Sequence, residues 1–253
     1  MADTLDLGIL VPAFIAGLLI LATHVPLGHE VLKRGIIFID LAIAQITGLG
    51  IIFASRMGFE THGWEVQLAA IGSALLAAWG LSLLEKYHPQ MQEAEIGVSF
   101  ILAATASILL LANHPHGGEQ LQEMLVGQIL WITWSDLLHV VLATLFILGV
   151  WFQLKSYRKV GFYFLFALAV TCSVQLVGVY LVFASLIIPA LGSRKHEGKK
   201  ALLIAYLIGV LGYGLGLIVS SIADLPSGAV IVWSISAMSL LFYLFTKKSD
   251  QMA

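Results

Sequence analysis

The chain has 253 residues, of which 59% are hydrophobic and 11% are charged, and its mean hydropathy of +0.95 lies far outside the range of soluble domains. This composition predicts an integral membrane protein, while 13 basic and 15 acidic residues without a basic stripe argue against nucleic acid as a partner. The single cysteine, Cys172, excludes an internal disulfide and a zinc site built on cysteines.

Apolar segments separated by polar connections predict an all-α integral membrane protein, a polytopic bundle of 8-9 transmembrane segments in one domain over 1-253. Basic residues near helix ends favour the cytoplasm, and Lys33 and Arg34 follow the first segment, so the amino terminus is expected outside. The carboxyl terminus, with Lys247 and Lys248, is expected inside. The segments cover about 7–23, 36–54, 66–84, 96–112, 136–153, 160–192, 201–222 and 228–245.

The segment 160–192 carries no charge and is too long for one crossing, because about 20 residues span the ~30 Å hydrocarbon layer. Basic residues flank both ends, so both ends are expected on the cytoplasmic side. We therefore predict a broken or re-entrant helical pair at about 160-192, with its turn between Thr171 and Gly178. Non-helical backbone at that depth must be buried by other helices or line a wet cavity, which places the pair inside the bundle.

Two polar residues stand out in the segment 36–54, Asp40 and Gln45. An acid in the apolar layer is costly, which makes Asp40 a candidate functional residue. The alternative is that Asp40 lies near enough to the cytoplasmic end to be hydrated, and pairs with Arg34.

The connection after 96–112 contains His114 and His116 and neither Lys nor Arg, as expected on the outer side. Imidazole is a common zinc ligand, so the two histidines could receive a metal ion together. An ordinary hydrated loop is the alternative, since a metal site needs more ligands. Asp136 and His139 share one helix face, where a structural contact and a substrate contact both remain open.

No motif of a hydrolytic enzyme is present: the sequence lacks Gly-x-x-x-x-Gly-Lys-Ser/Thr, Gly-x-Ser-x-Gly and His-Glu-x-x-His. Energy or chemistry would have to come from another chain, and the sequence predicts passage of a solute rather than an enzyme. The Gly-x-x-x-Gly spacing of Gly212 and Gly216 predicts a close approach between helices.

Three stretches, at 34–50, 173–194 and 216–233, together resemble the permease subunits of the zinc and manganese ABC importer family, ABC-3 type. Weaker similarity at 93–103 and 125–137 extends the match in the family's order. The resemblance implies a homodimeric membrane pore in the bacterial inner (cytoplasmic) membrane, with cytoplasmic ABC ATPase subunits and a periplasmic or lipid-anchored metal-binding protein. It implies alternating access for transported Zn²⁺, or Mn²⁺ as the second choice, with no covalently bound cofactor.

Two departures from the family pattern affect what the resemblance implies. Family members commonly carry a His four residues after the Asp, whereas position 44 is Ala and Gln45 follows. An amide oxygen is a weaker zinc ligand than an imidazole, so the metal identity stays open. The family's ATPase-docking loop is also reduced to Lys155 to Lys159, too short for a docking helix of ordinary length.

We assign roles on this basis. The translocation path would include Asp40, Gln45, Gln175 and Asp224, although Asp224 could equally be an outer turn residue that caps the last helix. The metal would meet Asp40, His114 and His116, and the ATPase would contact Arg194, Lys195 and His196. Two rivals remain: a permease for a chelated metal or small organic solute, and a non-transporting membrane scaffold.

Overall fold

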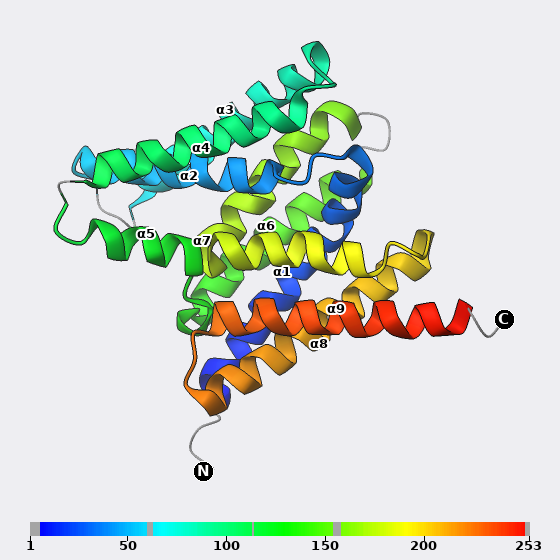
Figure 1. Cartoon of the computed structure of the whole chain (residues 1–253). Helices are drawn as coiled ribbons and strands as arrows, with labels where there is room; N and C mark the ends of the chain where they lie inside the picture. The colour runs from blue at the N-terminus through cyan, green and yellow to red at the C-terminus, as the bar shows by residue number, and fades with distance from the viewer. Residues whose placement is uncertain (1–5, 60–62, 113, 154–157, 251–253) are drawn as a thin grey trace.

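The computed structural model describes residues 6–59, 63–112, 114–153 and 158–250, and at 158–160 and 245–250 it describes the backbone alone. Within these ranges the chain forms nine α-helices and one short 3₁₀ helix, η1, without strands (Figure 1). Eight of the helices are long and apolar enough to cross a membrane, which confirms the polytopic bundle. The helices are α1 Leu7–Arg34, α2 Ile39–Arg56, α3 Trp64–Tyr87, α4 Gln92–Leu111, α5 Gly117–Val126, η1 Ile129–Trp131, α6 Trp134–Gln153, α7 Arg158–Gly192, α8 Gly198–Ala223 and α9 Ser227–Asp250.

Helix α7 is the predicted broken pair. Its helical backbone is interrupted at Gly178, where φ is 76° and ψ is 166°. Figure 1 shows the second half, 179–192, running from this bend back toward the side where the first half, 158–177, began. The bend is tightly packed, because a Cβ on Gly178 would lie 2.4 Å from the backbone nitrogen of Gly127. Glycine is therefore required twice, for its backbone conformation and for its lack of a side chain.

The beginning and the end of α7 both lie beside the last two turns of α1, as the basic flanks predicted. At the start of α7, the Phe162 ring lies under the Arg34 guanidinium, with 4.3 Å from the ring centre to the guanidinium carbon. Just after the end of α7, Ser193 Oγ lies 3.1 Å from His29 Nε2. The pair thus enters and leaves at one end of the bundle, which we call the basic end.

Helix α1 is longer than predicted. The sequence suggested an end at about residue 23, followed by Pro26, but the helix continues through Pro26 to Arg34. A proline inside a helix leaves the carbonyl four residues earlier without its usual donor. In the structure the Tyr206 hydroxyl of α8 donates to that carbonyl, Ala22 O, at 3.2 Å. A hydrogen bond from another helix therefore replaces the missing backbone bond, as is common in membrane proteins.

The connection after α4 is only partly a loop. The sequence left the stretch around His114 and His116 as a hydrated connection, but its second part folds into α5. Helix α5 is short and amphipathic, and it packs against α7. The end of α5 packs against the start of α9, because a Cβ on Gly228 would lie 2.6 Å from the Val126 carbonyl oxygen.

The glycines of α8 serve packing, as predicted. A Cβ added to Gly212 would lie 2.7 Å from Ile235 Cα, and one added to Gly216 would lie 2.6 Å from Ile231 Cα. Helices α8 and α9 therefore touch backbone to backbone. The predicted short loop at 155–159 falls mostly on 154–157, which lie outside the described residues.

Candidate functional site

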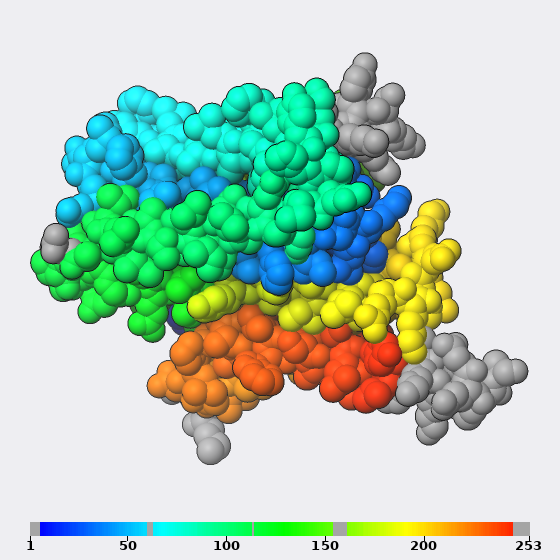
Figure 2. All heavy atoms as spheres, turned by 45° about the horizontal axis from the view of Figure 1, so that its top comes forward, coloured from blue at the N-terminus to red at the C-terminus, as the bar shows by residue number. Residues whose placement is uncertain are grey.

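A cavity of about 620 Å³ lies beside the second half of α7. Residues of α2, α4, α5 and α9 complete its wall, and α6 and α8 contribute nothing to it. In Figure 2 the second half of α7 (yellow) reaches the surface between α4 and α5 on one side and the orange and red helices α8 and α9 on the other. The lining is almost entirely apolar, and Gln45 and Tyr180 bring the polar groups.

Gln45 reaches this cavity because of its position on α2. It lies four residues after Leu41, which also lines the cavity, and residues at this spacing share a helix face. The Gln45 side chain is otherwise buried at 4% exposure. An amide in an apolar wall at membrane depth is costly unless it meets a polar partner, so Gln45 is the best-placed candidate of the predicted path.

Asp40 lies on a different face of α2. It is in the first turn, 1% exposed, and outside the cavity lining. Within the described part of the chain, neither of its carboxylate oxygens has a hydrogen-bond partner. Arg34, its partner in the alternative interpretation, instead forms ion pairs with Glu30 and Glu85. Asp40 is therefore a buried acid without a hydrogen-bond partner among the residues described, which keeps it a candidate for a functional role.

The structure does not bring Asp40 and Gln45 together. Position 44, where the family's histidine would stand, is the one that shares the face of Asp40, and Ala44 is buried there. Gln45 points elsewhere, because five residues along a helix is about 140° around its axis. The amide therefore cannot replace the missing imidazole beside Asp40.

The other two predicted path residues lie apart from the cavity lining. Gln175 is exposed, three residues before the break in α7. Asp224 is exposed at the end of α8, where it adopts a left-handed conformation with φ 52°. It closes α8, whereas the sequence suggested a cap for the last helix, which begins at Ser227. Asp is one of the few residues besides Gly that adopts this conformation readily.

The predicted metal residues fall into two separate places. His114 and His116 are exposed between α4 and α5, and His116 Nδ1 lies 3.0 Å from Glu119 Oε2. Asp40 lies near the start of α4, whose 20 residues measure about 30 Å from end to end. One ion cannot bind all three. Across the described ranges no group of three or more His, Cys, Asp or Glu side chains could hold a metal ion.

The predicted ATPase-contact residues lie together at the basic end. Arg194 and Lys195 are exposed, and both lie over the Tyr243 ring, at 5.6 Å and 4.4 Å from its centre. His196 is half-buried, and its N–H donates to Ser193 O. These residues connect the end of α7 to α8, so a partner that binds here would touch the broken helix directly.

Asp136 has a structural role. Its carboxylate accepts hydrogen bonds from the Thr133 N–H at 2.9 Å and from the Thr133 hydroxyl at 2.7 Å. The Asp136 N–H donates in return to Thr133 Oγ1. This reciprocal pair is a capping box at the start of α6, and the Thr-x-x-Asp spacing was the signal for it.

Met124 of α5, which forms part of the cavity wall, was not predicted from the sequence. A Cβ on Gly48 would lie 2.2 Å from Met124 Sδ, so the thioether packs directly on the α2 backbone. Met124 also lines the cavity beside Gln45. The signal was available in Gly48, whose missing side chain leaves room for a neighbour, but the neighbour could not be named from the sequence.

Three comparisons place the chain among known proteins. It matches the ABC 3 transport family over residues 6–158 and 153–246. It is similar to the manganese transport system membrane protein MntC of Halalkalibacterium halodurans, 23% identical over 88% of this chain and 82% of that protein. It is also similar to the "probable iron transport system membrane protein" of Haemophilus influenzae, 24% identical over 82% of this chain and 79% of that protein. Among solved structures, a chain of PsaBC from Streptococcus pneumoniae in complex with Fab has the same fold, with a TM-score of 0.73, 19% identity and coverage of 93% and 91%.

Proposed function

The chain belongs to the ABC 3 transport family, and on that premise we propose that it is the membrane-spanning permease subunit of an ATP-binding cassette importer for a divalent transition metal ion. The observation that carries the proposal is the cavity beside the broken helix α7, with the Gln45 amide in a mostly apolar wall. A helix interrupted at membrane depth is tolerated where it is buried or lines a cavity, and α7 is both. Separate ATPase subunits would supply the energy for alternating access.

Manganese is the first cargo to test. The acidic and amide candidates Asp40 and Gln45 offer oxygen ligands, which suit Mn²⁺, whereas Zn²⁺ favours nitrogen and sulfur. Relatives named for manganese and for iron support this order. Zinc, the first choice from the sequence, becomes the second cargo in the proposal.

The proposed assembly has two copies of this chain in the inner membrane of a bacterium, with 1–253 as one permease domain. The ATPases would bind at the basic end, where Arg194, Lys195 and His196 are grouped. A metal-binding protein would deliver the ion at the opposite end, beside α5, with His114, His116 and Asp224 nearest to it. Gln175 would lie close to the bend of α7, between this entrance and the cavity.

The test begins with purification of the tagged chain from its native membrane and identification of what co-purifies. Recovery of an ATPase in about equal amount is expected, since a permease half needs one ATPase per copy. The complex is then reconstituted in liposomes with its binding protein, and uptake of radioactive Mn²⁺ is measured with ATP and with a non-hydrolysable analogue. ATP-dependent uptake supports the proposal, while an intact dimer that never binds an ATPase would rule it out and favour the scaffold.

A chelated metal or small organic solute is the second candidate, and one observation favours it. The cavity of about 620 Å³ is large for a bare ion and is lined mostly by apolar side chains, as ligand pockets for organic molecules are. The same liposomes separate the two: stimulation of ATP hydrolysis by free Mn²⁺ on its binding protein favours the ion. Stimulation only by a metal complex favours the chelate.

A further inference from the structure

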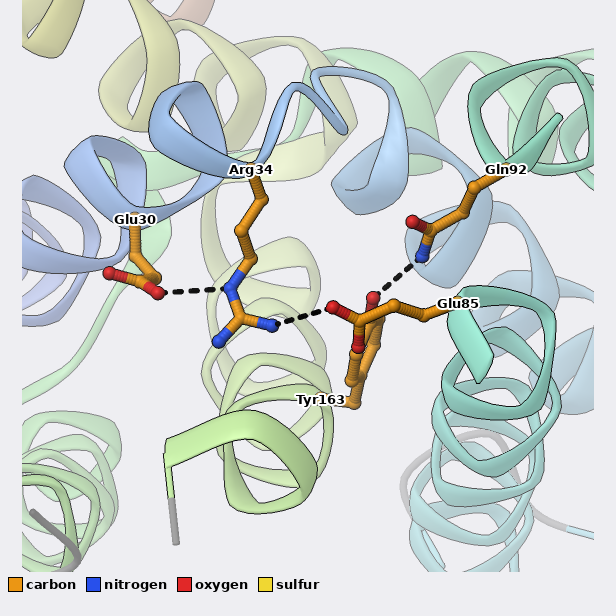
Figure 3. Close-up of polar contacts among 5 residues, drawn as sticks. All are labelled: Glu30, Arg34, Glu85, Gln92 and Tyr163. Carbon is orange, nitrogen blue, oxygen red and sulfur yellow. Dashed lines mark hydrogen bonds and ion pairs between the residues drawn. The ribbon is translucent and has the colours of Figure 1, made fainter. Parts of the chain in front are cut away.

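Four helices meet in one polar cluster at the basic end (Figure 3). Arg34 of α1 donates through Nε to Glu30 Oε1 at 3.0 Å and through Nη1 to Glu85 Oε1 of α3 at 3.4 Å. Gln92 of α4 donates to the Tyr163 hydroxyl of α7 at 2.6 Å. Figure 3 shows Arg34 between its two carboxylates, with Tyr163 and Gln92 beyond Glu85. We call these five residues the Arg34 cluster.

Arg34 also holds the second turn of α7, through the aromatic rings of Phe162 and Tyr163. Its guanidinium carbon lies 4.3 Å from the Phe162 ring centre and 5.9 Å from that of Tyr163. The Arg34 side chain is only 13% exposed, so little water weakens these contacts. The Trp151 ring of α6 packs on Phe162 from 6.4 Å, which adds the end of α6 to the same assembly.

The cluster stands between two functionally important places. Helix α7 begins directly after the connection from α6, and α2, with Asp40 in its first turn, begins five residues after Arg34. The start of α2 is held from the other side as well, because the Phe38 N–H donates to Glu93 Oε1 of α4 at 3.3 Å. A displacement of α7 at Phe162 and Tyr163 would therefore reach α1, α3 and α4, and through them the start of α2.

We propose that Arg34 is a coupling residue, which makes the second turn of α7 move with α1 and α3 as one body and so transmits the ATPase stroke to the start of α2. This rests on the proposed function, because coupling requires a partner ATPase. A planar guanidinium suits the task, since it bridges two carboxylates and lies flat on a ring at the same time. A lysine ammonium can pair with a carboxylate or lie over a ring, but it lacks the planar fork that does both in one fixed geometry.

The first test compares Arg34→Lys and Arg34→Gln with Lys33→Gln, which removes a neighbouring, exposed charge. In the reconstituted complex, both Arg34 variants are expected to hydrolyse ATP at near the wild-type rate while metal uptake per ATP falls about tenfold. Lys33→Gln is expected to match the wild type. Adding Glu85→Gln to Arg34→Gln is expected to cause no further loss, because the shared interaction is already gone. A parallel fall of hydrolysis, uptake and folded yield would mean that the cluster only stabilises the chain.

A second measurement is independent of the cargo. Spin labels at Tyr87→Cys in α3 and Gln153→Cys in α6, both exposed positions, span the cluster in a Cys172→Ala background. Their distance is measured in the ATPase complex without nucleotide and after vanadate trapping. We expect one unchanged distance in the wild type, and in Arg34→Gln a longer or broader distribution after trapping.

The outcomes separate the two proposals. A distance that changes equally in the wild type and in Arg34→Gln, or in neither, overturns the coupling role. A fixed wild-type distance that Arg34→Gln releases, in a complex that takes up neither Mn²⁺ nor Zn²⁺, supports the coupling role and rejects the proposed cargo. A chain that never binds an ATPase overturns both.

Discussion

Two aspartates illustrate how differently one residue type is used in this chain. Asp136 accepts two hydrogen bonds from Thr133 at the start of α6. Asp40 is buried in α2, and its carboxylate oxygens have no hydrogen-bond partner among the residues that the structure describes. A partnered carboxylate stabilises its helix, whereas an unpartnered one in an apolar surrounding costs stability.

We expect Asp40→Ala to abolish metal accumulation while folding and assembly stay intact. The fall in uptake should be at least the ~10–100-fold that is typical when a residue around a metal site is lost. The reason is that the carboxylate has no hydrogen-bond partner to lose among the described residues. Uptake per folded molecule and the melting temperature in detergent measure the two effects. Asp136→Ala is the matched control, with about 1 kcal/mol less stability and unchanged uptake. Normal uptake by a well-expressed Asp40→Ala would remove Asp40 from the path.

Gln45 provides the test of metal choice. Gln45→His would put an imidazole into the cavity wall and is expected to shift the uptake ratio from Mn²⁺ toward Zn²⁺, since zinc favours nitrogen ligands. Uptake of the two ions in competition measures the ratio. Gln67→His, at an exposed position of α3, should leave it unchanged. An equal shift in both variants would show that the cavity is not the route.

At the scale of elements, two features depend on single backbone groups: the break in α7 and the continuation of α1 through Pro26. Both are places where an α-helix would ordinarily be disrupted. At the proline, the Tyr206 hydroxyl supplies the missing donor. At the break, the backbone of Gly127 packs closely against Gly178.

Gly178→Ala is expected to lower the free energy of unfolding by more than the ~1–3 kcal/mol that its backbone conformation alone costs, because the new methyl group would also strike Gly127. Gly149→Ala in α6 is the control, since nothing lies within 4 Å of its Cβ position. There alanine should be neutral or stabilising by up to about 1 kcal/mol. Unfolding in detergent measures both, and equal stability of the two variants would contradict the packed bend.

Tyr206→Phe is expected to cost about 1–3 kcal/mol, because it leaves the Ala22 carbonyl without a donor. Pro26→Ala would restore a backbone N–H for that carbonyl. In a double-mutant cycle, Tyr206→Phe should therefore cost clearly less in the Pro26→Ala background. Additive free energies would mean that the hydroxyl does not serve the proline break.

At the scale of the whole molecule, the cavity is open on one face. Its wall comes from α2, α4, α5, α7 and α9, while α6 lies elsewhere. The Gln45 amide is part of this wall, and a polar group in an apolar surrounding is costly unless it meets a polar partner. A second copy over this face would enclose the cavity, in agreement with the homodimer that the family resemblance implies.

We expect Trp233→Cys, at a residue that lines the cavity and is 79% exposed, to form disulfide-linked dimers on mild oxidation in membranes. Leu142→Cys, exposed on α6, is expected to stay monomeric. Both are made in the Cys172→Ala background and compared on non-reducing gels. Efficient cross-linking at Leu142 but not at Trp233 would place the dimer contact on the other side of the molecule.

Hydropathy and charge by themselves determined the membrane class, the eight long apolar segments and the broken pair at 160–192. They suffice because both signals are read from consecutive residues. The length of an apolar segment is compared with the thickness of the membrane, and the basic residues lie directly beside the segment. The family resemblance likewise depended on short stretches in order, and the family match agrees with it.

Only the tertiary structure decided which polar groups have partners. Arg34 binds Glu85 rather than Asp40, Tyr206 carries α1 through Pro26, and Gln45 faces the cavity while Asp40 does not. These pairings join residues on different helices, up to 184 positions apart. Helical periodicity gives the angle between two side chains on one helix. Which residue of another helix each side chain contacts depends on how the helices pack.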